Sequence, residues 1–451
     1  MKLHNGSKSP SQGGSVPQVV IVGGGFAGVE AAKALGKAPA QVTLIDRTNH
    51  HLFQPLLYQV AAATLSVDDI ASPIRQLFQN QKNTRVLMAE VTGIDSVEQR
   101  VFMGGQSIPY DYLILASGAQ KTYFGNDHWA KVAPGLKTVE DAINIRNQIL
   151  LAFEQAEVCA DPQECQERLT FVLVGGGPTG VELAGTIAEM ARLTIDTEFD
   201  AIDPTTLRII LVQSGPRILP MFAETLSAEA QKQLENLGVE VLLDSRVKEV
   251  DDTGVWISVS HPDSSMADQR IACRNVFWTA GVQASPAGKW LEVETDRAGR
   301  VKVNPDLSVP GLPNVFAVGD TAAMESGGKP VPGLAQGAMQ SGRYAARVVA
   351  AKLTGKPVPA PFVYNDLGSM ATIGRTFAVM EVGTLKWSGL PAKLAWLAVH
   401  IAVLNQLENQ LSVLLQWAWT YMTKERGARI ITTPVATPDA LLPRLQMESS
   451  K

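Results

Sequence analysis

The sequence predicts an α/β fold with two domains of the same strand–turn–helix type, followed by a C-terminal helical segment. Three observations support this prediction. A glycine-rich strand–turn–helix pattern occurs twice. Short apolar strands that end in small residues follow each copy. The last part of the chain contains short apolar stretches and is rich in tryptophan.

The length and composition of the chain limit the classes of protein it can be. A chain of 451 residues is too long for one ordinary hydrophobic core, so two or three domains are expected. The net charge of −5 creates no overall field that favours nucleic acid, and no nucleic-acid partner is expected. The cysteines, at 159, 165 and 273, are too few and scattered for a disulfide framework, which indicates a reducing compartment.

The N-terminus is not typical of a targeting segment. Residues 1–16 are polar and rich in Ser and Gly, which indicates a flexible tail rather than a cleaved secretory signal. No run of about 18 apolar residues occurs anywhere in the chain, so no ordinary membrane span is expected.

The repeated pattern accounts for the two domains. Residues 19–35 read VVIVGGGFAGVEAAKAL, and residues 171–187 read FVLVGGGPTGVELAGTI. Each copy runs from an apolar strand through Gly-x-Gly-x-x-Gly into a helix. The first glycine permits the tight turn, the second lets a pyrophosphate approach the backbone, and the third lets the helix pack on the strand. The six glycines in these places are Gly23, Gly25, Gly28, Gly175, Gly177 and Gly180.

Each turn leads into the N-terminus of a helix, whose free N–H groups and dipole attract phosphate groups. The sequence therefore predicts two Rossmann-like dinucleotide-binding domains. The next strand distinguishes the two copies. The first copy's strand ends in Asp46, whose carboxylate can accept hydrogen bonds from a ribose, unless it is a plain turn residue. The second copy's strand ends in the neutral Gln213.

Three further strings resemble the reductases that bind FAD and NAD(P)H in two dinucleotide-binding domains. Residues 110–119 read YDYLILASGA, residues 275–281 read NVFWTAG, and residues 314–320 read NVFAVGD. The resemblance places Gly118, Gly281 and Asp320 at the cofactors, with Asp320 at the ribityl chain of FAD.

The order of these strings implies an interrupted first domain. We expect an FAD-binding domain from residues 17–140 and 270–365, with an NAD(P)H-binding domain, residues 141–269, inserted in it. Residues 366–451 are expected to form a C-terminal segment that associates with a membrane.

Within this group the chain resembles the type II NADH:quinone oxidoreductases, which are single-chain, FAD-containing respiratory enzymes that do not pump protons. Residues 50–63, HHLFQPLLYQVAAA, resemble a string beside the flavin. Residues 333–342, GLAQGAMQSG, resemble the helix at the flavin and quinone pocket, with Gln336 and Gln340 in its two glutamine places. The string from 414 to 432 resembles the membrane-contacting end. The resemblance covers roughly residues 17–432.

Three residues are candidates for the chemistry. The resemblance places Glu182, two residues after Gly180, near the flavin and nicotinamide, where it can serve a proton route to the quinone. A plain first-turn acid that complements the helix dipole is the alternative. Gln336 and Gln340 are four residues apart, hence on one helix face, and amides can bind quinone carbonyls without adding charge. A pair of surface glutamines is the alternative.

The expected cofactors are FAD and, as substrate, NADH or NADPH. Gln213 stands where the resemblance would place a glutamate in a member specific for NADH, so we expect both nucleotides to be used. No metal is expected, because the histidines at 50, 51 and 400 have no metal-ligand spacing. Redox-active cysteines are disfavoured, because none precedes position 159.

The C-terminal segment has apolar stretches of about half a membrane span, at residues 394–404 and 411–422. This pattern favours a hairpin or broken helix lying in the membrane interface. A dimer-forming or core helix pair is the alternative. The cationic residues expected at the flanks are Lys386, Lys393, Lys424, Arg426 and Arg429.

The leading hypothesis is a peripheral NAD(P)H:quinone oxidoreductase at the cytoplasmic face of the cell membrane, or at another energy-transducing membrane. Its expected partners are a membrane quinone and the lipid bilayer surface; a homodimer is left open. Two alternatives remain: a soluble reductase of a ferredoxin-like protein, and a redox-responsive protein that binds FAD and NADH without turnover.

Overall fold

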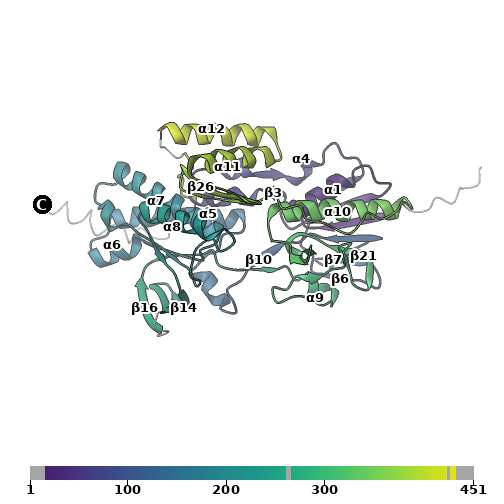
Figure 1. Ribbon diagram of the computed structural model, residues 1–451, viewed down its shortest axis with the longest axis horizontal. Helices are drawn as coiled ribbons and strands as arrows, with labels where there is room; N and C mark the ends of the chain where they lie inside the picture. Colours follow the sequence, from purple (N-terminus) through teal and green to yellow (C-terminus); the bar gives the residue numbers. More distant parts are fainter. Residues whose placement is uncertain (1–15, 261–265, 424–426, 433–451) are drawn as a thin grey trace, which may run out of the picture. The chain divides into compact units, whose positions relative to one another are not determined.

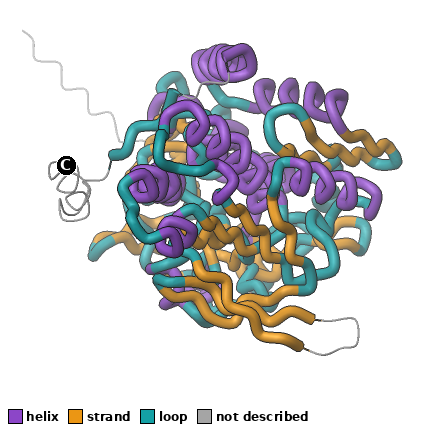
Figure 2. The backbone as a smooth tube through the Cα atoms, turned by 90° about the vertical axis from the view of Figure 1, so that its left-hand side faces the viewer, coloured by secondary structure: helices purple, strands orange, loops and turns teal. Residues whose placement is uncertain are grey.

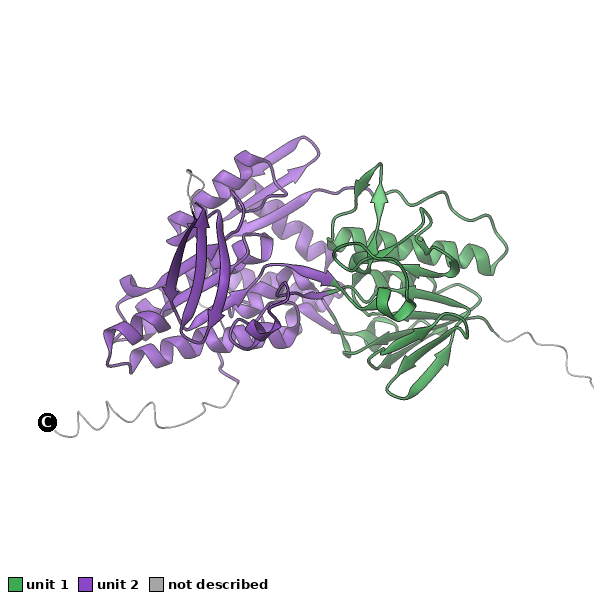
Figure 3. Ribbon diagram, turned by 90° about the horizontal axis from the view of Figure 1, so that it is seen from below, with its two compact units in different colours: residues 1–51, 73–119, 284–364 green, residues 52–72, 120–283, 365–451 purple. Residues whose placement is uncertain are grey.

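The computed structural model describes residues 16–260, 266–423 and 427–432, and within it the chain forms two compact units (Figure 3). The expected tail, residues 1–16, lies outside the described residues except for Val16. Each unit is assembled from three separate stretches of chain. Unit 1 consists of residues 1–51, 73–119 and 284–364, and unit 2 of residues 52–72, 120–283 and 365–451.

Unit 1 is built on a six-stranded sheet in the order β20-β21-β9-β1-β2-β5. All neighbours pair in parallel except the edge strand β20, which is antiparallel to β21. The central strands are runs of branched apolar residues buried on both faces, as parallel strands require. The strands are β1 (Gln18–Val22), β2 (Gln41–Asp46), β5 (Thr84–Met88), β9 (Tyr112–Leu115), β20 (Ser308–Val309) and β21 (Leu312–Ala317).

Helices α1 (Phe26–Ala34) and α10 (Ala335–Leu353) pack closely in unit 1 (Figure 1). A Cβ atom on Gly342 would lie 2.1 Å from the backbone oxygen of Ala27, so only glycine allows this approach. Arg343 also forms an ion pair with Glu30 of α1. The unit further contains the antiparallel strands β6 (Gly93–Asp95), β7 (Arg100–Met103) and β8 (Gln106–Pro109), and the short helices α4 (Ile74–Leu77) and α9 (Ala287–Leu291).

Unit 2 contains a four-stranded parallel sheet in the order β13-β12-β11-β17. Its strands are β11 (Thr170–Val174), β12 (Arg208–Val212), β13 (Val239–Leu242) and β17 (Asn275–Trp278). Its larger helices are α5 (Val139–Glu157), α7 (Pro178–Glu198) and α8 (Glu224–Asn236). A separate antiparallel sheet is formed by β14 (Ser245–Asp251), β15 (Gly254–Ser260) and β16 (Met266–Ala272) (Figure 2).

The C-terminal part of the chain belongs to unit 2. It consists of the antiparallel strands β25 (Ser369–Ile373), β26 (Phe377–Val382) and β27 (Leu385–Ser388), then α11 (Gly389–Val403) and α12 (Leu407–Thr423). Helix α11 packs on β26 (Figure 1). Helix α12 contacts the short α3 (Val67–Ile70). Within the described ranges, no helix combines the length and the apolar character needed to cross a bilayer.

The two units differ from the expected domain boundaries in three places. Residues 52–72 lie in unit 2, because α2 (Leu57–Ala61) packs on α5 and α7. Unit 2 also runs from 120 to 283 instead of 141 to 269, since β17 is the fourth strand of its parallel sheet. Two of the crossings between the units lie in the paired strands β10 (Ala119–Lys121) and β18 (Val282–Ala284). Finally, residues 366–451 form part of unit 2 rather than a separate body.

Candidate functional site

The first glycine turn joins β1 to α1 in unit 1. Gly23 has a φ of +107°, and a Cβ atom there would lie 2.3 Å from the oxygen of Ala116. A Cβ on Gly28 would lie 1.8 Å from the oxygen of Gly23, so the helix packs directly on the turn. By contrast, no atom lies within 4 Å of a Cβ placed on Gly25, which leaves open space beside the helix N-terminus.

This helix N-terminus is suited to an anion. Gly25 is the N-cap residue of α1, no side chain of the described part caps it, and the first turn carries no acid. Its N–H groups therefore remain available to a pyrophosphate. Asp46, at the end of β2, accepts a hydrogen bond from the Gly24 amide at 2.5 Å, which holds its carboxylate beside the turn.

The ends of β9 and β21 meet the same edge of the sheet, because both strands run parallel to β1. The Gly118 amide donates to Thr321 Oγ1 at 2.8 Å, which links the end of β9 to the turn that carries Asp320. Gly333 lies close to Asp320: a Cβ there would be 3.3 Å from Asp320 Oδ1. The structure therefore brings Gly118 and Asp320 to the edge that carries the glycine turn.

His51 lies beside this turn and was not among the residues predicted to bind a cofactor. Its Nδ1 is 2.9 Å from the backbone oxygen of Gly24, while its buried Nε2 has no hydrogen-bond partner among the described residues. Burial lowers the pKa of the imidazole, which favours the neutral ring. A buried polar atom without a partner, beside an open glycine turn and a strand-end carboxylate, fits the binding of FAD in unit 1.

The second glycine turn, in unit 2, repeats this geometry. Gly175 has a φ of +113°, and a Cβ on Gly180 would lie 1.9 Å from the oxygen of Gly175. Gly177 is the N-cap of α7, again without a capping side chain in the described part and with open space beside it. Thr279 Oγ1 donates to the oxygen of Val174 at 2.8 Å, so the chain after β17 is fixed beside the turn.

Gln213 stands one residue past the end of β12, where it resembles Asp46 in its contacts. Its Oε1 accepts from the Gly176 amide at 2.9 Å, and its Nε2 donates to the oxygen of Arg217 at 3.3 Å. The guanidinium of Arg217 donates to the oxygen of Pro220 at 3.0 Å and lies 3.8 Å from Glu224 Oε1.

Glu182 lies in the first turns of α7 and is buried. Its Oε1 accepts from the backbone amide of Thr372 in β25, at 3.3 Å. The hydroxyl of the same threonine accepts from Lys393 Nζ of α11, at 2.7 Å. Thr372 thus links a buried carboxyl group to a buried amine, and Lys393 is not at the flank of an interfacial helix, where the sequence had placed it.

Burial shifts the pKa values of both groups toward neutral pH. Desolvation raises the pKa of Glu182 to about 8, against the opposing effects of the Thr372 amide and Lys393. Desolvation also lowers the pKa of Lys393 to about 8, against the opposing charges of Glu189 and Glu182. At pH 7 both groups therefore carry a proton in most molecules, and both lose it near pH 8.

A cluster of aromatic side chains lies on one side of the amine, with Trp396 in contact with it. Lys393 Nζ lies 4.4 Å from the centre of the Trp396 ring, and Trp396 stacks on His400 at 4.1 Å. Burial lowers the pKa of His400 to about 4, so this ring is neutral at pH 7. Trp417 of α12 donates to Gln59 Oε1 at 2.8 Å. This apolar surrounding explains why both pKa values shift so far.

Gln336 and Gln340 lie on α10 of unit 1, one helical turn apart and both half-buried. The expected helix and the common face are therefore present. Ser341 of this helix accepts from the Gly319 amide at 3.0 Å, which fixes α10 to the turn that carries Asp320.

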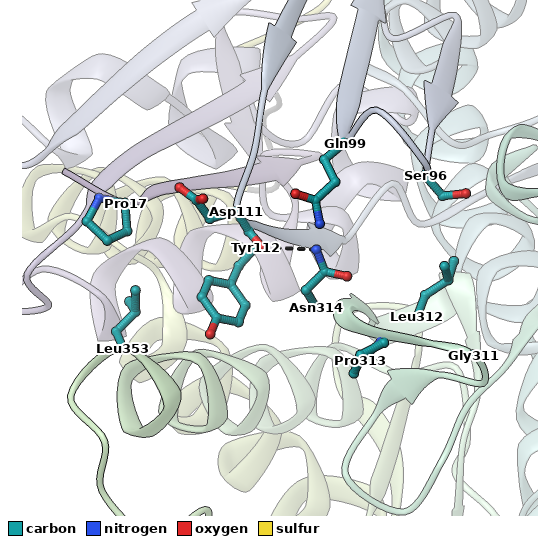
Figure 4. Close-up of a pocket in the computed structure, with 10 residues that line it drawn as sticks. All are labelled: Pro17, Ser96, Gln99, Asp111, Tyr112, Gly311, Leu312, Pro313, Asn314 and Leu353. Atoms are coloured by element: carbon teal, nitrogen blue, oxygen red, sulfur yellow. Dashed lines mark hydrogen bonds between the residues drawn. The ribbon is translucent and has the colours of Figure 1, made fainter. Parts of the chain in front are cut away.

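A cavity of about 640 Å³ lies elsewhere in unit 1 (Figure 4). It is lined by residues at the starts of β1, β9 and β21, where Asn314 donates to the oxygen of Asp111 at 3.1 Å. This edge is opposite to the one that carries the glycine turn, so the cavity is not part of the candidate site. Among the described residues, no group of three or more His, Cys, Asp or Glu is arranged to hold a metal ion.

Comparison with known proteins identifies the family. A family model described as pyridine nucleotide-disulphide oxidoreductase matches residues 17–342. The type II NADH:quinone oxidoreductases NdhA and Ndh of Mycobacterium tuberculosis are 46% and 47% identical to the chain. The alignment with NdhA covers 95% of this chain and 92% of NdhA. The chain belongs to the type II NADH:quinone oxidoreductases. The resemblance found in the sequence is confirmed.

Other relatives of this type II enzyme are more distant. The demethylphylloquinone reductase NdbB of Synechocystis is 31% identical over 89% of this chain and 95% of its own length. The structure of NDH2 from Plasmodium falciparum in complex with NADH matches with a TM-score of 0.83 at 21% identity, covering 92% of this chain and all of that chain. This second likeness shows the fold alone, and it confirms the predicted α/β arrangement.

Proposed function

We propose that the chain oxidises NADH, passes two electrons through FAD, and reduces a membrane quinone. The family membership supports this activity, and the linked Glu182 and Lys393 are the structural observation that carries it. When bound, FAD supplies the chemistry that joins hydride acceptance to quinone reduction. Rapid anaerobic oxidation of NADH with a short-chain quinone tests the proposal. Purified protein that contains FAD but gives no quinol would overturn it.

The residues of unit 1 would hold FAD and those of unit 2 the nicotinamide nucleotide. We assign the pyrophosphate of FAD to the Gly23–Gly28 turn, and the two ends of that cofactor to Asp46 and Asp320. The second pyrophosphate is assigned to the Gly175–Gly180 turn. Gly118, with a positive φ and open space beside it, lets the backbone approach a cofactor without a side chain in the way. Gly281, which also has a positive φ, is assigned to the nicotinamide nucleotide.

Glu182 and Lys393 would supply the protons that quinone reduction consumes. Both groups hold a proton at pH 7 and release it near pH 8, so neither needs a large driving force to give it up. A carboxyl group with an ordinary pKa would already have lost its proton at pH 7, and an ordinary amine would hold it too tightly.

Gln336 and Gln340 are assigned to the quinone. We expect Gln336→Ala or Gln340→Leu to lower the rate with a short-chain quinone by about tenfold, because each loses an amide that binds a quinone carbonyl. Oxidation of NADH by ferricyanide, which needs no quinone slot, should change by less than about twofold. Steady-state rates with the two acceptors measure this difference, and equal losses with both acceptors would contradict the assignment.

The choice of nicotinamide nucleotide is assigned to Gln213. A neutral amide binds a ribose hydroxyl without repelling a 2′-phosphate, so NADPH is expected to be used alongside NADH. Gln213→Glu should lower kcat/KM for NADPH at least tenfold more than kcat/KM for NADH, measured at fixed salt. The glutamate can still accept from the Gly176 amide, as Asp46 does in unit 1 from the Gly24 amide. A native chain that already rejects NADPH about a thousandfold would show that another group excludes it.

The exposed apolar face of α11 and α12 is proposed to bind the lipid surface. Large apolar side chains are seldom exposed in such numbers on two neighbouring helices unless they meet a membrane or another protein. Within its described residues, neither helix is long and apolar enough to cross a bilayer, so both would lie in the interface. The exposed residues are Leu390, Leu394, Val399, Val403, Leu407, Leu411, Leu414, Leu415, Trp419, Tyr421 and Met422. A soluble reductase of a ferredoxin-like protein would not need these exposed apolar residues on α11 and α12.

We place the protein as a peripheral enzyme at the cytoplasmic face of the cell membrane, or at another energy-transducing membrane. Of the flanking cations expected from the sequence, Lys386 is exposed, and Arg429 pairs with Glu198. Lys424 and Arg426 lie outside the described residues. A homodimer formed through the same face is the alternative, and sedimentation of a variant of this face distinguishes the two.

A further inference from the structure

Phe124 has an unusual backbone and an exposed ring. It follows strand β10 in unit 2 and has a φ of +53°, a region that aromatic residues rarely adopt. Its side chain is 67% exposed although it is fully apolar. The Phe124 amide donates to Thr122 Oγ1 at 3.2 Å, which holds the bend. Strained backbone of this kind is concentrated at functional sites, so a strained bend that carries a largely exposed aromatic ring suggests a binding role.

The ring lies directly against the backbone of Gly281. A Cβ atom on Gly281 would be 2.4 Å from Phe124 Cζ, so any side chain there would displace the ring. Trp278 supports the same segment: its indole N–H donates to the oxygen of Thr122 at 2.9 Å, and its ring meets the Phe124 ring edge-on at 6.4 Å. The position of Phe124 is thus fixed by the end of β17 and the residues after it.

The end of β17 is where one half of a bound dinucleotide is expected. In the order β13-β12-β11-β17 the crossover direction reverses between β11 and β17, and ligands bind at such a point. With the pyrophosphate at Gly177 and the adenosine half at Gln213, beyond β12, the other half extends toward β17. That half carries the nicotinamide, and Phe124 and Gly281 lie at that end of the sheet.

We propose that the ring of Phe124 is a wall of the nicotinamide subsite and contacts the nicotinamide–ribose half of the nucleotide. This inference rests on the proposed function, since it takes NADH as the substrate of unit 2. A planar nicotinamide packs well against an aromatic ring, and the ring excludes water from the transferred hydride. Gly281 has no side chain because the Phe124 ring fills that space.

Two ligands that differ only in the nicotinamide separate this role from a structural one. NAD⁺ contains the nicotinamide, and ADP-ribose lacks it but keeps the adenosine and pyrophosphate. Phe124→Ala is expected to weaken binding of NAD⁺ about tenfold, as measured by calorimetry on the FAD-loaded protein. Binding of ADP-ribose should change by less than twofold, because the second glycine turn and Gln213 are untouched.

Two further variants control the experiment. Phe124→Tyr keeps the ring and should bind NAD⁺ within about twofold of the native protein. Phe102→Ala removes a phenylalanine of unit 1 that is also exposed, at 40%, and should change neither affinity. Retained FAD absorbance shows that each variant is folded.

Three results would overturn the inference: equal losses for NAD⁺ and ADP-ribose, no loss for either, or a native protein that binds both ligands equally. These outcomes do not depend on quinone reduction. A failure of the proposed function appears instead in the native protein, as NADH binding without transfer of electrons to quinone. The two ideas therefore fail in different experiments.

Discussion

Replacing Glu182 with glutamine is expected to slow quinone reduction by roughly 100-fold, the usual cost of losing a proton-transferring group. Glutamine keeps an oxygen that can accept from the Thr372 amide and resembles the protonated carboxyl in shape and charge. It cannot release a proton, however. Oxidation of NADH by ferricyanide should change by less than about threefold, because that acceptor takes up no protons. Equal losses with both acceptors would show that Glu182 acts on an earlier step or on folding.

The pH dependence of the rate provides the second half of this test. Because Glu182 and Lys393 both have pKa values of about 8, both are protonated below that pH and both lose their protons above it. The rate with quinone should therefore be level below pH 7 and fall steeply above pH 8. In Glu182→Gln and in Lys393→Met the fall should be shallower, since one titrating group remains. A fall of native steepness in either variant would contradict the proton route.

The second large effect is expected at the membrane. Leu415 and Trp419 lie one turn apart on α12 and are 69% and 56% exposed. Burying each in a lipid interface contributes about 1.5–3 kcal/mol, so replacing both with glutamate should weaken vesicle binding by at least about 100-fold. Flotation with phospholipid vesicles measures this loss. The rate with a short-chain soluble quinone should stay within about threefold of the native value.

The matched control is Val97→Glu, which places the same charge on an apolar residue of unit 1 that is 87% exposed. It should float with vesicles as the native protein does. If the α12 variant still binds vesicles but changes from dimer to monomer in sedimentation, the face joins two copies and the lipid proposal is wrong. Point substitutions are preferable to removing residues 386–451, because that deletion would also remove the buried Lys393 and Trp396.

The sequence predicts the nucleotide-binding elements well because their signals are local. The glycine spacing, the apolar strands and the residues that end them all lie within one strand–turn–helix unit, so Asp46 and Gln213 were placed correctly beside their turns. Neighbouring parallel strands then bring Gly118 and Asp320 to the same edge, as the order of the strings implied.

The sequence indicated only one member of the pair Glu182 and Lys393, because the geometry of the pair depends on distant parts of the chain. The sequence singled out Glu182 from its place after Gly180, but no nearby residue indicates that the Thr372 amide of β25 donates to it. Lys393 resembled an interfacial lysine because its neighbours are apolar. The same neighbours are equally compatible with burial, and only the packing of α11 on β26 distinguishes the two. The expected domain boundaries differ from the two compact units for a related reason: β17 carries no local sign of which sheet it joins.

The close contact between Gly342 and Ala27 has a consequence for how this enzyme tolerates sequence change. Helix α10 is held to α1 at that contact and to the Asp320 turn through Ser341, and the same helix carries Gln336 and Gln340. Inserting one residue into α10 would rotate everything beyond it by about 100° and break this register. Insertions between residues 335 and 343 should therefore not be tolerated. Substitutions on the exposed side of the helix should be neutral. The positions of Gln336 and Gln340 relative to the first nucleotide turn are therefore constrained together, and neither can change without the other.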